Sequence, residues 1–272
     1  AVVAGTADAQ TLNVSNLSAG TFTADGIEAI TVNGSLVAST LAGVASDAVT
    51  SLTLTGDQDL TISAATTFAV TTSTAAIAST IDASALTGAM SVLVGDTSTV
   101  KVTGGSAADT INMAATLETN DVIDGGDGVD TLTMTAATLT TQFTNVSNVE
   151  TVAFNVAIAG NTMDVSKLSA GVTTVSVDNS DQTDGSPGKL AQVVSGLSGQ
   201  TVLLKHSRAD ATDSNDSDGN ALTITNALDT TADTVSVTLD GIGSGSASAN
   251  VSWGQDEIDV NAFETVNLAS NT

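Results

Sequence analysis

The chain has 272 residues, with 30 acidic against 5 basic residues, a formal net charge of −25 and no cysteine. This charge argues against nucleic acid and anionic membrane surfaces as partners, because both would repel the protein. Without cysteine there can be no disulfide, thiolate zinc site or cysteine nucleophile.

Aromatic residues make up 2% of the chain and there is one proline, so a core built on large aromatic anchors is not expected. No segment approaches the roughly 20 apolar residues that a membrane-spanning helix needs, and we expect no membrane insertion. The first ten residues, AVVAGTADAQ, contain neither an initiator methionine nor a basic segment. We therefore expect a processed product or a piece of something longer.

Short segments that alternate apolar residues with Thr, Ser or Asn recur along the chain, and this period of two is typical of β-strands. Helical periodicity is weak, and only Ser84–Leu86 and Ser166–Leu168 are expected to form short helical turns. The predicted strands are Leu12–Val14, Ala29–Val32, Leu52–Thr55, Leu60–Ile62, Val92–Val94, Val100–Val102, Ile111–Met113, Leu132–Met134, Val152–Phe154, Val175–Val177, Val202–Leu204, Leu222–Ile224, Val235–Leu239 and Val266–Leu268.

Two phrases repeat within the sequence. In the first, a strand end leads into a turn that begins at a serine and packs one leucine inward; it occurs at Leu12–Gly20, Ile81–Ala89 and Met163–Gly171. In the second, a glutamate precedes alternating apolar residues; it occurs at Ile27–Val32, Val149–Phe154 and Phe263–Leu268. The spacing of the second phrase predicts two diverged β-repeat units, residues 1–135 and 136–272.

Repeated short strands with small side chains favour an all-β fold of the elongated β-solenoid kind, in which each coil pairs with its neighbours. The alternative is a pair of tandem β-sandwiches, which would show longer strands and more hairpin turns of the Asn-Gly type.

The most specific motif is Gly125–Leu132, which fits the pattern G-G-x-G-x-D-x-(large apolar) of calcium-binding turns. Glycines let such a loop curl so that carbonyl oxygens face one point, and a hard cation prefers oxygen ligands. Gly104–Ile111 is a weaker copy with Ala107 in place of the third glycine. Either segment could instead be a plain hairpin turn.

A second acidic segment, Ser207–Ala221, contains four aspartates but does not fit an EF-hand loop, because Thr225 stands where the bidentate glutamate belongs. It is either a looser calcium loop or a solvated acidic loop. The only histidine, His206, lies beside it, and surface charge pairing is a simpler explanation for it than catalysis. The sole tryptophan, Trp253, is expected in a core or an interface. We expect no enzyme activity.

The double-glycine loops, the Ile81–Leu86 turn and the Val149–Val152 strand resemble the calcium-dependent S-layer proteins of Gram-negative bacteria, which carry nonapeptide repeats of the RTX kind and use type I secretion. Giant type I secreted adhesins look similar. The resemblance implies Ca²⁺, an extracellular location at the cell surface, and a loop carboxylate at Asp130 and Asp109. With two nonapeptides, a long calcium-filled roll is not expected. The candidate metal ligands are Gly104, Asp109, Asp124, Gly125, Gly126, Asp127, Gly128, Asp130, Asp213, Asp216 and Asp218.

Three hypotheses follow for the function. The first is a secreted surface-layer protein that assembles with copies of itself into a calcium-stabilised lattice or filament and contacts cell-surface polysaccharide through a separate region. The second is the calcium-binding repeat region of a type I secreted adhesin. The third is the non-catalytic repeat region of a secreted enzyme. Repetition without one concentrated cluster of mixed chemistry favours the first.

Overall fold

The computed structural model describes residues 5, 7–66, 68, 77–95, 98–135, 142–154, 162–178, 192–205, 222–226, 232–240, 258–261 and 263–271. The protein is a β-solenoid-like stack of short strands, and all strand pairings between these residues for which a register is defined are parallel. This confirms the solenoid prediction. Tandem β-sandwiches would require antiparallel sheets.

The chain divides into two compact units, Ala1–Thr133 with Gln142–Glu150 and Met134–Thr141 with Thr151–Thr272. The proposed duplication of residues 1–135 in residues 136–272 stays a prediction.

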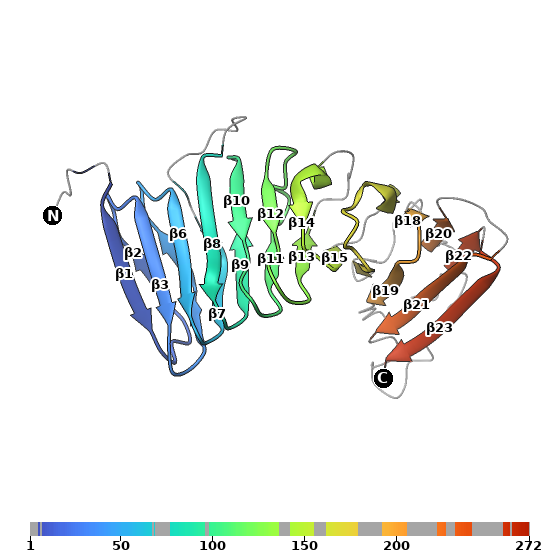
Figure 1. Ribbon diagram of the computed structural model, residues 1–272, viewed down its shortest axis with the longest axis horizontal. Coiled ribbons are helices and arrows are strands. Elements are labelled where there is room, and N and C mark those ends of the chain that lie inside the picture. The colour runs from blue at the N-terminus through green and yellow to red at the C-terminus, as the bar shows by residue number, and fades with distance from the viewer. Residues whose placement is uncertain are drawn as a thin grey trace, which may run out of the picture. The chain divides into compact units, whose positions relative to one another are not determined.

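In unit 1 most coils contribute one strand to each of two sheets, and the strands of a sheet lie side by side (Figure 1). Hydrogen-bonded partners in adjacent coils lie 20 residues apart at Asp8 and Glu28 and 22 apart at Asn33 and Thr55, and a longer coil separates Ser51 from Thr80 by 29 residues. One sheet contains, in order, β1 (Ala9–Val14), β3 (Ala29–Gly34), β6 (Ser51–Gly56), β8 (Ser79–Leu86), β10 (Val100–Thr103), β12 (Val122–Asp124) and β14 (Val146–Ser147). The other contains β4 (Ser39–Leu41), β7 (Leu60–Thr66), β9 (Met90–Val94), β11 (Thr110–Asn112) and β13 (Thr131–Met134). A short pair, β2 (Thr21–Thr23) and β5 (Gly43–Ala45), accompanies them.

The core of unit 1 consists of columns of apolar side chains, one per coil, stacked in register. Because side chains alternate between the two faces of a strand, the residues between them face outward, as the alternating burial of β3 and β6 shows. One column is Ile30, Leu52, Ile81, Val102, Ile123 and Val146, and the opposite one is Leu41, Ile62, Val92, Ile111 and Leu132; all are buried.

Unit 2 repeats this arrangement. One series of parallel strands is β15 (Thr151–Phe154), β17 (Thr174–Asp178), β19 (Thr201–Lys205), β21 (Thr234–Asp240) and β23 (Thr265–Asn271). The other is β16 (Thr162–Asp164), β18 (Gln192–Leu197), β20 (Leu222–Asn226) and β22 (Ile258–Asn261). No helix among the described residues is long and apolar enough to cross a membrane.

Of the two predicted helical turns, the one at Ser166–Leu168 is confirmed. It corresponds to a 3₁₀ turn, η2 (Val165–Lys167), which is capped by the Asp164 side chain. A further 3₁₀ turn, η1, covers Gln142–Asn145. The prediction for Ser84–Leu86 was wrong, because these residues continue β8. Within β8 the Asp82 side chain accepts the Ser84 N–H, a local hydrogen bond that is also typical of turns. Pairing with β6 nevertheless keeps the backbone of this segment extended.

The column packing predicts a contrast within one strand. Leu54→Ala should lower the free energy of unfolding by about 2–5 kcal/mol, because it leaves a cavity in a fully buried column. Thr53→Ala, on the outward face of the same strand, should cost under about 1 kcal/mol. Urea denaturation followed by circular dichroism measures both; equal losses would contradict the assignment of inner and outer faces.

Candidate metal centre

The two double-glycine loops lie one above the other, at the same corner of adjacent coils. Gly104–Asp109 joins β10 to β11, and Gly125–Asp130 joins β12 to β13. Because β10 pairs with β12 and β11 with β13, the loops stack in register. The Asp127 N–H donates to the Gly105 carbonyl oxygen at 3.0 Å, which joins the loops directly.

Glycine is required in these loops by close backbone contact. A Cβ on Gly104 would collide with the carbonyl oxygen of Gly125, and a Cβ on Gly125 would collide with that of Asn148 in the next coil. Gly126 and Gly128 have φ of +92° and +134°, values that residues with a side chain rarely adopt. Ala107 has no such positive φ, so the weaker copy curls differently from Gly125–Asp130.

The two loop aspartates are buried, but their carboxylates are used differently. Asp109 accepts the Met90 N–H at 2.7 Å through Oδ1 and the Gly105 N–H at 2.5 Å through Oδ2. Asp130 accepts the Asp109 N–H at 2.7 Å through Oδ1. Its Oδ2 has no hydrogen-bond partner in the part of the chain that the structure describes, and Asp130 is only 1% exposed. A buried charged oxygen without a donor is costly, so this atom requires a proton or a cation.

One backbone carbonyl oxygen lies on the same side of Gly125 as the unpartnered Oδ2. The Oδ2 atom lies 2.8 Å from the point where a Cβ on Gly125 would stand, and the Asn148 carbonyl oxygen borders the same point. The pKa of the Asp130 carboxyl is raised from 3.8 to about 6, chiefly by burial. The hydrogen bond from the Asp109 N–H opposes this rise, and the carboxylates of Asp109, Glu150 and Asp124 contribute to it. Burial likewise raises the pKa of Asp109, opposed by the hydrogen bonds from Met90 and Gly105.

The remaining candidates in the loop lie nearer to solvent. Asp124 is partly exposed and accepts the Gly126 N–H at 3.2 Å and the Asn148 Nδ2 at 2.7 Å. Asp127 is exposed. Asp213, Asp216 and Asp218 lie outside the described residues, as do His206 and Trp253.

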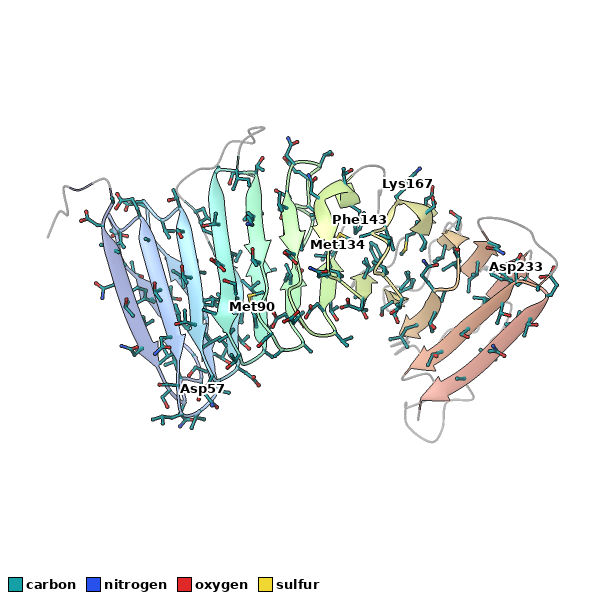
Figure 2. All side chains as sticks on the ribbon, in the orientation of Figure 1. Asp57, Met90, Met134, Phe143, Lys167 and Asp233 are labelled. Carbon is teal, nitrogen blue, oxygen red and sulfur yellow. The ribbon has the colours of Figure 1, made fainter. Side chains whose placement is uncertain are left out.

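The loop aspartates belong to a wider set that we call the pre-strand carboxylates. These are acidic residues that stand immediately before a strand and accept the backbone N–H of a residue in the preceding coil, at 2.7–2.9 Å. Met90, labelled in Figure 2, donates the first N–H of a continuous ladder that passes through Asp109 and Asp130 to Glu150. Among the described residues the set is Glu28, Asp109, Asp121, Asp130, Glu150 and Glu264.

The pre-strand carboxylates explain the second repeated phrase, in which a glutamate precedes alternating apolar residues. Glu28, Glu150 and Glu264 recur in the sequence, but the sequence alone does not reveal that each accepts an N–H from the preceding coil. Neither Asp121 nor Asn148 was predicted as a site residue. For Asn148 the sequence gives no signal except its position directly after the strand end at Ser147.

The residues present fit a calcium ion at Asp130 in their chemistry. Within the described residues no group of three carboxylate or imidazole side chains could hold a metal ion. A cation here would therefore take Asp130 Oδ2 together with backbone carbonyl oxygens, which is the ligand chemistry that calcium accepts.

Comparison of the chain with family models, curated proteins and solved structures gives no match.

Substitution by asparagine should change the free energy of unfolding differently at Asp109 and at Asp130. In chelator, Asp109→Asn should lower the free energy of unfolding by about 1–3 kcal/mol, because an amide cannot accept both N–H groups. Asp130→Asn should be as stable as the wild type or more so, since Oδ1 still accepts the Asp109 N–H and a buried charge is removed. Thermal melts in chelator compare them; an Asp130→Asn variant less stable than Asp109→Asn would contradict this assignment.

The raised pKa of Asp130 also predicts a pH dependence. The folded state holds the Asp130 proton more tightly than the unfolded chain, so this contribution to stability is complete below about pH 4 and is lost as pH rises through about 6. In chelator, the wild type should therefore lose more stability than Asp130→Asn between pH 4 and pH 7. Denaturation curves across this range measure the difference, and parallel profiles for the two proteins would refute it.

Proposed function

We propose that this protein is a structural component of an extracellular surface layer, a secreted β-solenoid that calcium stabilises and that assembles with copies of itself. The observation that carries the proposal is the unpartnered, buried Oδ2 of Asp130 at the stacked glycine loops, with the Asn148 carbonyl oxygen on the same side of Gly125. The resemblance of these loops to RTX-type S-layer sequences supports it.

The charge of the chain supports the same proposal. With 30 acidic and 5 basic residues, the compact state repels itself, and few cationic side chains can offset this. Near Asp130 the carboxylates of Asp109, Asp124 and Glu150 add to the local negative potential. A divalent cation would neutralise this cluster where three consecutive coils meet.

The role of calcium would be to fix the register of these coils. Asp130 would supply Oδ2, and the loop glycines and Asn148 would supply carbonyl oxygens, while Asp130 Oδ1 keeps its bond to the Asp109 N–H. An ion that binds only the folded state stabilises it by mass action, by about 2.7 kcal/mol at a hundredfold excess over the dissociation constant. Calcium would thus stiffen a scaffold that has no disulfides.

Calcium should raise the melting temperature of the wild type by roughly 5–10 °C relative to chelator, from that binding energy and the usual enthalpy of a chain of this size. Magnesium should have a smaller effect, because it demands a tighter octahedral shell. Asp130→Asn should lose most of the calcium response, and Asp213→Ala should keep more of it. A melting temperature that calcium leaves unchanged would refute the proposed function.

A further inference from the structure

The Asp124 side chain joins the loop Gly125–Asp130 to the coil that follows it. One of its oxygens, Oδ1, accepts both the Gly126 N–H at 3.2 Å and the Asn148 Nδ2 group at 2.7 Å. Gly126 belongs to the loop, whereas Asn148 directly follows β14 in the next coil. A single carboxylate oxygen therefore holds these two segments together.

The backbone of Asn148 is in the left-handed region, with φ of +50°. Asparagine adopts this conformation more readily than most residues. Successive carbonyl groups of an extended strand point to opposite sides of it. Here the Ser147 carbonyl oxygen accepts the Gly125 N–H at 3.0 Å, and the Asn148 carbonyl oxygen also borders Gly125. The left-handed residue thus turns a second carbonyl group toward the preceding coil.

This second carbonyl oxygen faces the same place as the unpartnered carboxylate oxygen. The Asn148 carbonyl oxygen and Asp130 Oδ2 both lie within 2.8 Å of the point where a Cβ on Gly125 would stand. Calcium accepts a carboxylate oxygen and a backbone carbonyl oxygen as neighbouring ligands. Because Asn148 is exposed, packing does not hold its peptide group, and the hydrogen bond to Asp124 restrains it instead.

The preceding coil, which the structure describes in full at this corner, serves as a comparison. Its loop, Gly104–Asp109, has the same arrangement of glycine, carboxylate oxygen and carbonyl oxygen from the next coil. There the Gly105 N–H donates to Asp109 Oδ2, so that oxygen is satisfied. Thr103 stands in register with Asp124 and has no carboxylate. The side-chain bond to the next coil and the unpartnered oxygen therefore occur in the same coil, and neither occurs in the coil before it.

We propose that Asp124 is a positioning residue of the calcium site. Its hydrogen bond holds Asn148 in the left-handed conformation, and the Asn148 carbonyl oxygen then serves as a ligand beside Asp130 Oδ2. This inference rests on the proposed function and deepens it, because it assigns the completion of the site to a residue outside the glycine loops. Asp124 acts on calcium affinity as a hydrogen-bond acceptor rather than as a ligand.

The test measures, on the 272-residue chain, the calcium concentration that gives half of the full rise in melting temperature. Asp124→Ala and Asn148→Gly should each raise this concentration about ten- to a hundredfold, as is usual when a residue that orients a metal ligand is removed. Asp124→Asn should raise it by less than about fivefold, because its amide oxygen still accepts the Asn148 Nδ2 group.

Melting in chelator separates this role from a merely structural one. Without calcium, Asp124→Ala and Asn148→Gly should melt close to the wild type, since the bond that they lose is exposed and glycine tolerates the φ of Asn148. Variants that lose as much stability in chelator as in calcium would show a structural role and overturn the proposal.

The double variant gives the decisive result. If Asp124 acts through Asn148, Asp124→Ala combined with Asn148→Gly should bind calcium no more weakly than the weaker single variant. Losses that multiply would mean that Asp124 acts by itself, and would overturn the proposal. An Asp124→Asn variant as weak as Asp124→Ala would do the same, which decides the question even where Asn148→Gly fails to fold.

Asn33→Ala is the matched control, because the Asn33 Nδ2 group also donates to a side chain one coil away, Asn13 Oδ1, at 2.9 Å. This pair lies on β1 and β3, away from the glycine loops, so the variant should keep the calcium response of the wild type. A normal wild-type response that Asp124→Ala and Asn148→Gly both retain would overturn the positioning role alone. A wild type that does not respond to calcium would refute the proposed function as well.

Discussion

The structure depends on one constraint, which is that every coil must stack on its neighbours in register. Parallel pairing between coils places the apolar residue of one strand directly over that of the next, as in the column from Ile30 to Val146. A slip of one residue would turn this column to solvent. The pre-strand carboxylates reinforce the register, because each can accept its N–H only when the two coils are aligned.

The same register concentrates negative charge. Since acidic residues recur at the position before a strand, stacking brings Asp109, Asp130 and Glu150 into one ladder. Asp109 is satisfied by two N–H donors, and Asp130 by only one. The loop that best fits the calcium pattern is therefore also the one whose carboxylate has an unused oxygen. Motif and geometry agree on Asp130 independently of each other.

Much of the fold could be predicted because its signals are local. Alternation at Leu52–Thr55 or Val235–Leu239 identifies strands, and every strand predicted from the sequence overlaps an observed one. Strands without strong alternation, such as β12 and β14, were missed because their pairing with adjacent coils stabilises them more than their own residues do. The helical-turn prediction for Ser84–Leu86 was wrong for the same reason, because pairing with β6 keeps these residues in a strand.

The candidate site was predictable in position but not in detail. The glycines and Asp130 follow from a pattern of eight residues, whereas the donors to Asp109 come from Met90, one coil earlier, and from Gly105. Asn148 borders the site from one coil later. Such partners depend on the register between coils, and the register is set by the whole stack rather than by any segment.

The central claim is that Asp130 Oδ2 is a calcium ligand, and a crystal structure of the wild type grown in millimolar calcium tests it most directly. The account predicts an ion about 2.3–2.6 Å from Asp130 Oδ2, with backbone carbonyl oxygens completing the shell. An Asp130 Oδ2 that instead accepts an N–H or lies in a site without an ion, at saturating calcium, would contradict the account.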